Sequence, residues 1–169
     1  RKIVETGEVK EGDVVLEIGP GKGALTAELL KSGATVFAIE KDFGMKDILE
    51  ETFEKEIKNK KLKIIFSDFL TEDIEKIIPK NKSFKVIANI PYYITGAIIE
   101  KTLSEKRRPN LAVFLVQKEV AERMIARDKK ESILSLSVKV FGIPKIIMTV
   151  SRNSFFPAPK VDSAILKIS

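Results

Sequence analysis

The sequence predicts an α/β fold: a mostly parallel seven-stranded sheet with helices on both faces and a final antiparallel pair of strands. Short β-branched and apolar runs alternate along the chain with longer charged segments that have helical spacing. A glycine-rich turn follows the first apolar run. The last two runs are joined by a proline-rich loop with no helix between them, so we expect that pair to be antiparallel.

Each predicted element begins and ends at a change of residue pattern. The apolar runs predict strands at Asp13–Ile18, Thr35–Ile39, Leu62–Phe66, Phe84–Ala88, Leu111–Val116, Lys145–Val150 and Ala164–Ile168. Helical spacing predicts helices at Ala24–Lys31, Lys46–Ile57, from Thr71, from Thr95 to about Glu105, Lys118–Arg127 and Ser132–Phe141. Thr71 and Thr95 are predicted N-caps, and Arg1–Gly7 resembles the tail of a helix.

The composition excludes several kinds of chemistry. The chain has 169 residues, enough for one domain with a full core. It contains no cysteine and no histidine, so disulfides, thiolate metal sites and imidazole bases are excluded. We expect no metal site and a reaction that depends on positioning and hydrogen bonding.

The charge balance favours an anionic partner. The net charge is +6, which suits nucleic acid, although a solvated lysine-rich surface is the alternative. No apolar run approaches the ~18 residues that span a bilayer, and no signal peptide opens the chain, so we expect a cytoplasmic protein. The bias towards Lys, Glu and Ile is typical of hyperthermophiles.

A glycine motif follows the first strand and opens the first helix. It runs Glu17-Ile18-Gly19-Pro20-Gly21-Lys22-Gly23, with a G-x-G-x-G spacing rather than the G-x-G-x-x-G of dinucleotide enzymes. Glycines let the backbone turn tightly and approach a ligand, and the helix N-terminus favours a carboxylate. The motif predicts a cofactor site, with an ordinary strand-to-helix turn as the alternative.

Two acids end the next strands. Glu40 can accept both hydroxyls of a ribose, or it can be a solvated charge. Asp68 can accept the exocyclic amine of an adenine, or it can be a helix N-cap.

Asn89-Ile90-Pro91-Tyr92 ends the fourth strand and is the most specific feature of the chain. An adenine N6 is a poor nucleophile, because its lone pair is delocalised into the ring. The Asn89 oxygen and a nearby backbone carbonyl can accept its two N–H bonds and draw the nitrogen towards sp³. Pro91 fixes the turn, and Tyr92 can stack on a flipped base. The alternative is a proline turn with two surface tyrosines.

A stiff proline-rich loop, Phe155–Ser163, joins the last two strands. Phe155 can form the second face of a base sandwich. The alternative is a hydrophobic loop that packs on a neighbouring domain.

Together these motifs resemble the small-subunit ribosomal RNA adenine dimethyltransferases of the KsgA type, which have a Rossmann-like class I methyltransferase fold. The matching stretches are VLEIGPGKGALT (15–26), AIEKD (38–42), SDFL (67–70), NIPYYIT (89–95), FLVQKEVAERM (114–124) and FFPAPKVDSAIL (155–166).

The resemblance implies S-adenosylmethionine as cofactor, S-adenosylhomocysteine as product, and small-subunit ribosomal RNA or the pre-ribosomal small subunit as partner. Two adjacent adenines near the RNA 3′ end would each receive two methyl groups. The implied cofactor residues are Glu17, Gly19, Gly21, Gly23, Glu40, Lys41, Asp68, Phe69 and Asn89. The implied catalytic residues are Asn89, Ile90, Pro91, Tyr92 and Phe155. We expect a monomer.

The chain also departs from the family pattern. The N-terminal lid segment and the C-terminal helical domain of the family are absent, so residues 1–169 are expected to be a catalytic domain. The usual Gly-Ser loop reads Asp128-Lys129-Lys130-Glu131-Ser132. We expect remaining RNA affinity to depend on exposed cations, namely Arg107, Arg108, Lys129, Lys130 and Lys160.

Three rival functions stay open. An Erm-type enzyme, which modifies large-subunit RNA, shares Asn-x-Pro-Tyr but often has Asn where Asp162 stands. A non-catalytic RNA-binding or transcription factor on this fold is disfavoured by the intact Asn89 motif. An NAD-dependent dehydrogenase is disfavoured by the glycine spacing.

Overall fold

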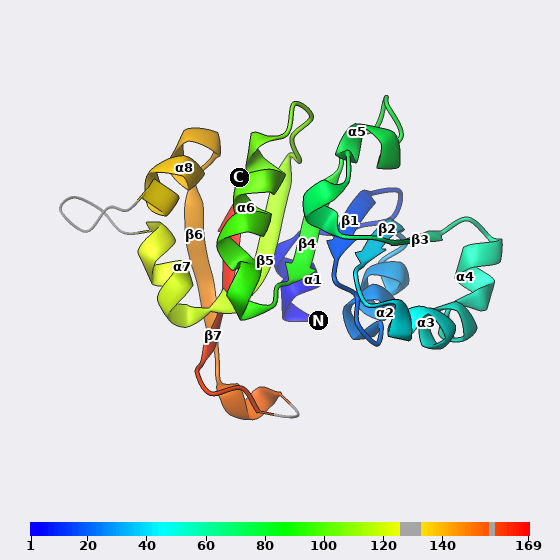
Figure 1. The fold of residues 1–169 in the computed structure, drawn as a ribbon, viewed down its shortest axis with the longest axis horizontal. Coiled ribbons are helices and arrows are strands. Elements are labelled where there is room, and N and C mark those ends of the chain that lie inside the picture. Colours follow the sequence, from blue (N-terminus) through cyan, green and yellow to red (C-terminus); the bar gives the residue numbers. More distant parts are fainter. Residues whose placement is uncertain (126–132, 156–157) are drawn as a thin grey trace.

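One seven-stranded sheet forms the centre of the molecule (Figure 1). The computed structural model describes residues 1–125, 133–155 and 158–169. The strand order is β3-β2-β1-β4-β5-β7-β6, and β7 runs antiparallel to both of its neighbours. The strands are β1 Val14–Ile18, β2 Thr35–Glu40, β3 Leu62–Phe66, β4 Lys85–Asn89, β5 Leu111–Gln117, β6 Pro144–Val150 and β7 Ser163–Ile168. The predicted sheet is confirmed, and each predicted strand end differs by at most one residue.

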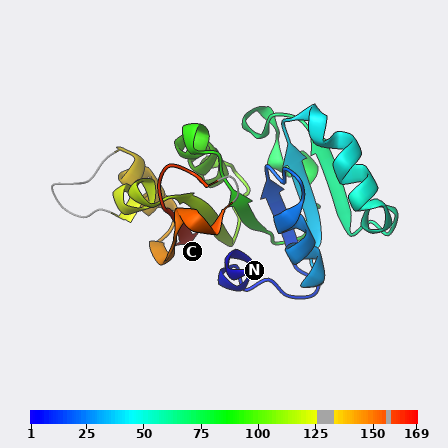
Figure 2. The same ribbon diagram turned by 90° about the horizontal axis from the view of Figure 1, so that it is seen from below.

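Helices cover both faces of this sheet (Figures 1 and 2). The α-helices are α1 Lys2–Thr6, α2 Ala24–Lys31, α3 Lys46–Thr52, α4 Glu54–Lys58, α5 Ile74–Ile77, α6 Thr95–Ser104, α7 Lys118–Ile125 and α8 Ile133–Phe141. Short 3₁₀ turns are η1 Phe43–Met45, η2 Phe69–Thr71, η3 Tyr92–Ile94 and η5 Arg152–Ser154. One buried cluster includes side chains of α5, α6 and α7, and the other includes side chains of α1, α2 and α3.

The two clusters follow from the alternation of side chains along each strand. Leu16 and Ile18 of β1 belong to the first cluster, whereas Val15 belongs to the second. All five residues of β1 are buried, as expected of a parallel strand covered on both faces. This explains why the central strands are continuous apolar runs rather than alternating ones.

The register of the strands sets the position of every residue that follows them. Ile18 lies opposite Ile39 of β2 and opposite Ala88 of β4. The next residues, Gly19, Glu40 and Asn89, therefore meet at one edge of the sheet. That edge includes the switch point between β1 and β4, where ligands of open α/β sheets bind.

The predicted helix Lys46–Ile57 is wrong as a single element. It is divided into α3 and α4 at Phe53, whose backbone angles are φ −116° and ψ 25°. The Phe53 ring is buried against the glycine turn, because a Cβ on Gly23 would lie only 2.3 Å from it. Packing between distant segments therefore overrides the helical spacing.

Both predicted threonine caps are wrong. Thr71 ends η2, and the cap of α5 is Asp73, whose carboxylate accepts the Glu75 N–H. Thr95 is the first residue of α6, and its hydroxyl donates to the carbonyls of Pro91 and Tyr92. An acid two residues nearer the helix thus took the role predicted for Thr71. The predicted ends of two helices at Arg127 and Ser132, and the loop between them, lie outside the described residues.

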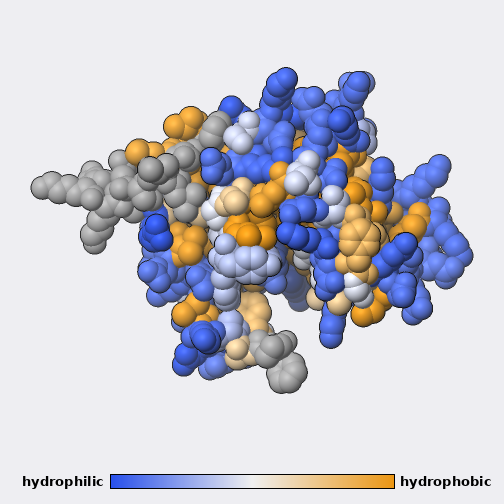
Figure 3. Space-filling model, viewed as in Figure 1, coloured by the Kyte–Doolittle hydropathy of each residue, from blue (hydrophilic) through white to orange (hydrophobic). Residues whose placement is uncertain are grey.

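The surface is largely polar. Figure 3 shows a mostly hydrophilic face on which apolar side chains emerge in patches. Within the described ranges, no helix combines the length and apolar character that crossing a bilayer requires.

We expect Gly23→Ala to destabilise the fold. Gly23 has φ +85°, and the new methyl group would overlap the Phe53 ring. The left-handed backbone costs about 1–2 kcal/mol and overpacking about 1–3 kcal/mol. Urea unfolding measures the change. Gly96→Ala in α6 is the control, since no atom lies within 4 Å of its Cβ position and its free energy of unfolding should not fall. Equal stability of the two variants would contradict the close packing of Gly23.

Candidate active site

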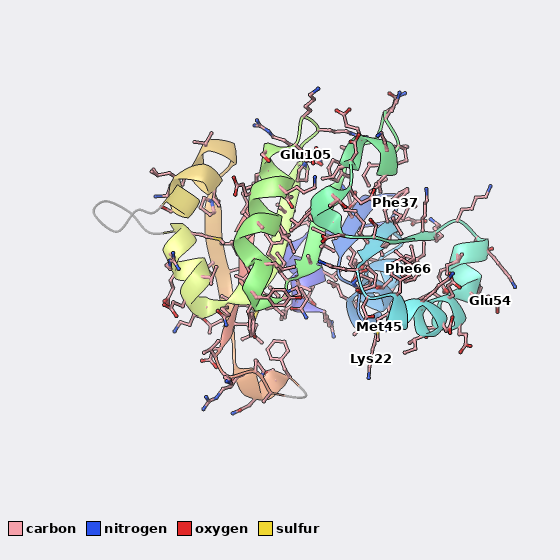
Figure 4. All side chains as sticks on the ribbon, viewed as in Figure 1. Lys22, Phe37, Met45, Glu54, Phe66 and Glu105 are labelled. Carbon is pink, nitrogen blue, oxygen red and sulfur yellow. The ribbon has the colours of Figure 1, made fainter. Side chains whose placement is uncertain are left out.

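A first cavity lies at the carboxyl ends of β1, β2 and β3, beside the start of α6. Its volume is about 230 Å³. It is lined by Ile18, Gly19, Ile39, Glu40, Lys41, Asp42, Ser67, Asp68, Phe69, Leu70, Pro91, Tyr93, Ile94 and Ile98. Five of the predicted cofactor residues meet here: Gly19, Glu40, Lys41, Asp68 and Phe69. In Figure 4, Lys22 of the glycine turn and Met45 mark this end of the molecule, and Glu105 lies at the opposite end.

The Glu40 carboxylate accepts hydrogen bonds from two turns at the rim of this cavity. Its Oε2 accepts the Gly21 N–H at 2.9 Å, and its Oε1 accepts the Asp42 N–H at 2.8 Å. The residue is only 7% exposed. Because each carboxylate oxygen has two lone pairs, Glu40 can hold both turns and still accept further donors.

Asp68 has two partners of its own chain. Its Oδ2 lies 2.7 Å from Lys41 Nζ, and its Oδ1 accepts the Leu70 N–H at 3.0 Å. The hydrogen bond from Lys41, helped by that from Leu70, lowers the pKa of the Asp68 carboxyl. Asp68 is therefore the N-cap of η2 as well as a cavity residue, so the two roles considered for it are compatible.

The three glycines of the turn differ in what they face. Gly19 and Gly21 have positive φ, and a Cβ at either would meet no atom of the described residues within 4 Å, apart from its chain neighbours. Gly23 packs against Phe53 and does not line the cavity. The turn thus leaves open space beside Gly19 and Gly21, whereas Gly23 serves packing.

Glu17 lies beneath the turn and outside the cavity lining. It is fully buried, and its Oε2 accepts the Thr26 hydroxyl at 2.7 Å. Its Oε1 has no hydrogen-bond partner among the described residues. Burial, with some repulsion from Glu40, raises the pKa of Glu17 to about 8. The side chain therefore holds a proton through most of the neutral range.

A second cavity, of about 330 Å³, lies beside the first. It is lined by Asn89, Ile90, Pro91, Tyr92, Phe155, Pro159 and Ser163. All five predicted catalytic residues meet here, although Phe155 is 63 positions from Tyr92 in the sequence. Among the described lining residues, Pro91 is common to both cavities. Asn89, predicted at both sites, lines the second cavity only.

Backbone and side-chain hydrogen bonds hold the segment that separates the cavities. The Ile90 N–H donates to the Leu115 carbonyl of β5 at 3.1 Å. The Thr95 hydroxyl donates to the Pro91 carbonyl at 3.2 Å. The turn is therefore fixed between β5 and α6, and the Asn89 side chain projects from a rigid strand end.

Sequence reasoning missed two residues of the second cavity, Pro159 and Ser163. The Tyr92 phenol oxygen lies 3.3 Å from the Ser163 hydroxyl oxygen, and either can be the donor. Ser163 ends the Lys-Val-Asp-Ser stretch, which was noted only as a family signature. That stretch was the available signal.

Arg107, predicted as an exposed cation for RNA, is half-buried and engaged by its own chain. Its guanidinium donates to the carbonyls of Ile78, Pro79 and Lys82 and lies over the Phe84 ring. It therefore closes a loop of its own chain. Two other predicted cations, Lys129 and Lys130, lie outside the described residues.

The family model described as Ribosomal RNA adenine dimethylase matches residues 1–169. The chain belongs to this family. As a family member, it is 41% identical over 167 residues to Ribosomal RNA small subunit methyltransferase A of Dehalococcoides mccartyi, covering 99% of this chain and 56% of that one. It is 44% identical over 169 residues to the protein of the same name from Mycoplasmopsis pulmonis, and this match covers 99% of this chain and 64% of that one. The chain thus spans 56% and 64% of the length of these two relatives.

Two solved structures resemble this chain closely. A dimethyladenosine transferase from Plasmodium falciparum has a TM-score of 0.81 and 35% identity, covering 99% of this chain and 59% of that one. The 23S rRNA methyltransferase ErmE has a TM-score of 0.82 and 31% identity, and this match covers 99% of this chain and 65% of that one. Both support the class I methyltransferase fold.

We expect the buried Glu17 to make the stability of this protein fall as pH rises. Between pH 4.5, its ordinary pKa, and about 8, the folded protein keeps a proton that the unfolded chain has lost. The unfolded state then binds fewer protons, so the free energy of unfolding falls by up to about 1.4 kcal/mol per pH unit.

Urea unfolding between pH 5 and 8.5 tests this expectation. Glu17→Gln should flatten the dependence, because an amide stays neutral and still accepts from Thr26. Glu28→Gln on α2, where the carboxylate is half-buried and pairs with Lys31, should keep the wild-type slope. Parallel curves for wild type and Glu17→Gln would contradict the raised pKa.

Proposed function

We propose that this protein transfers methyl groups from S-adenosylmethionine to the N6 atoms of two adjacent adenines near the 3′ end of small-subunit ribosomal RNA, dimethylating each. The reaction would serve ribosome biogenesis. The observation that carries the proposal is the shared wall at Pro91: a cavity suited to a nucleoside cofactor adjoins a cavity suited to a base.

The first cavity fits the cofactor. Glu40, at its rim, has lone pairs left for ribose hydroxyls, and the edge beside Gly19 and Gly21 is open. Asp68 is available to an adenine amine, with Phe69 and Lys41 beside it. Glu17 does not line the cavity and instead accepts the hydroxyl of Thr26 in the helix that follows the turn. S-adenosylmethionine supplies an electrophilic methyl group when it is bound there.

The second cavity fits a flipped adenine. Tyr92 and Phe155 lie on its walls and can stack on the two faces of the base. The Asn89 side-chain oxygen and the Ile90 carbonyl can accept the two N6–H bonds, which favours the sp³ form of the nitrogen. No imidazole or thiol is present in the chain, and the reaction needs no general base, because the N6 proton can leave to water after transfer.

The small subunit is the preferred substrate over the large one. The fold does not discriminate, since an Erm structure and a dimethyladenosine transferase match about equally well. The stretch Lys160 to Ser163, with Asp162, favours the small-subunit type. Two curated relatives, at 41% and 44% identity, are named Ribosomal RNA small subunit methyltransferase A. A radioactive methyl donor offered to each purified subunit discriminates the two.

The second candidate function is not enzymatic: an RNA-binding or transcription factor that has the same fold. The complete Asn89 to Tyr92 segment and its paired cavities argue against it.

We further propose that residues 1–169 form the catalytic domain and act in the cytoplasm as a monomer. The charged composition supports a thermophilic source.

We expect Glu40→Ala to weaken S-adenosylmethionine binding about 10- to 150-fold, the usual effect of losing a charge-assisted hydrogen bond of 1.5–3 kcal/mol. Loss of the Gly21 and Asp42 anchors adds to the effect. Calorimetry measures affinity, and urea unfolding checks that the variant is folded. The exposed Glu50→Ala is the control. Unchanged affinity in a folded Glu40→Ala variant would remove Glu40 from the site.

We expect Asn89→Ala to abolish methyl transfer nearly completely while cofactor affinity changes little, because Asn89 acts where N6 rehybridises. Tyr92→Ala should instead weaken capture of the base, with stacking of about 1–3 kcal/mol. Single-turnover rates on unmethylated small-subunit particles, followed by mass mapping of dimethyladenine, measure both. Transfer by Asn89→Ala at the wild-type rate would exclude this mechanism, and methylation confined to large subunits would favour the Erm type.

A further inference from the structure

The hydrogen bond between Tyr92 and Ser163 joins two segments of the second cavity that are far apart in sequence. We infer that Ser163 is a positioning residue that fixes the Tyr92 ring as one wall of the base cavity. Its neighbour Asp162 fixes the segment that carries the other aromatic lining residue, Phe155. The inference rests on the proposed function, because it assigns Ser163 a part in holding the acceptor base.

The Tyr92 ring needs an anchor. Tyr92 begins η3, directly after Pro91, and is 36% exposed. Its carbonyl accepts the Thr95 hydroxyl, which fixes the backbone but not the ring. Among the described residues, the phenol has its hydrogen bond with Ser163. That contact therefore restricts the direction of the ring.

Ser163 is well suited to anchor it. The residue is 1% exposed and begins β7, where it lies opposite Gln117 of β5 and Val150 of β6. A backbone paired on both sides holds its Cβ in place. Serine also adds little bulk to the cavity that it lines, so it offers a hydroxyl without filling the space of a base.

Asp162 fixes the opposite wall from the adjacent position. Its carbonyl accepts the Lys118 N–H at 3.0 Å, which anchors it to the end of β5 and the start of α7. Its Oδ1 accepts the Arg152 N–H at 2.9 Å, at the start of η5. The Phe155 N–H in turn donates to the Arg152 carbonyl.

Two consecutive residues, Asp162 and Ser163, thus hold the segments that carry both aromatic lining residues. Ser163 contacts Tyr92 directly, and Asp162 reaches Phe155 through Arg152. The spacing of the walls is set at the start of β7, and stacking a base between two rings requires that spacing to be kept.

The first test measures catalysis in Ser163→Ala, Tyr92→Phe and the double variant on unmethylated small-subunit particles. Each single change should lower kcat/KM about 2- to 10-fold, the effect of one neutral hydrogen bond. The double variant should fall no further than the worse single variant, because both changes remove the same bond. Affinity for S-adenosylmethionine should stay unchanged.

Two further variants serve as controls. Ser163→Thr keeps the hydroxyl and should restore most of the activity lost in Ser163→Ala. Ser104→Ala removes a hydroxyl hydrogen-bonded to the Lys101 carbonyl at the end of α6 and should have no effect. If Ser163→Ala unfolds, Tyr92→Phe carries the test, because it removes the same bond without altering β7.

The second test needs no turnover. The chain has two tyrosines and no tryptophan, so in a Tyr93→Phe background Tyr92 is its only tyrosine. Time-resolved fluorescence anisotropy should show a larger fast component in Ser163→Ala than in Ser163→Thr.

Additive losses in the double variant, or equal ring mobility in the Ala and Thr variants, would overturn the role of Ser163. If wild type methylates neither subunit while the anisotropy still changes, the proposed function fails but the anchoring of the ring stands.

Discussion

The parallel pairing of β1 with β4 is the constraint on which the site depends. The two strands are distant in sequence, and their connection contains β2 and β3 with their helices. Because Ile18 lies opposite Ala88, the glycine turn and Asn89 leave the sheet side by side. A slip of one residue would turn the side chains of β4 to the other face and move the Asn-x-Pro-Tyr segment away from the turn. The two buried clusters on opposite faces hold this register.

The strands and the convergence of most candidate site residues could be predicted because they depend on local patterns. The central strands are apolar runs with abrupt polar ends, and parallel strands bring those ends to one edge. Glu40, Asp68 and Asn89 each follow such a run, so their convergence follows from topology. The break at Phe53 could not be predicted in this way, since it depends on the Gly23 contact and not on the helical spacing.

Contacts between distant segments also could not be predicted from the sequence. Arg107 stands between two cations, Lys106 and Arg108, and its surroundings suggested an exposed group. Only the folded chain brings the carbonyls of residues 78, 79 and 82 to its guanidinium. The Lys41–Asp68 ion pair is a similar case, because both residues were predicted at the cofactor site but not as partners. Residue types indicated a candidate chemistry, and tertiary contacts decided which groups remain available for it.

The shared wall at Pro91 has a kinetic consequence. Under the proposed function, dimethylating one nitrogen would consume two cofactor molecules, so a spent cofactor would have to leave between the two transfers. Since the linings described here have Pro91 in common and otherwise differ, the proposed sites would let the spent molecule depart from its own side while the base stayed stacked between Tyr92 and Phe155. Such an arrangement favours processive conversion, in which the singly methylated adenine remains bound until the second transfer. The accumulation of that intermediate would then depend on how long the aromatic walls retain the base relative to cofactor exchange.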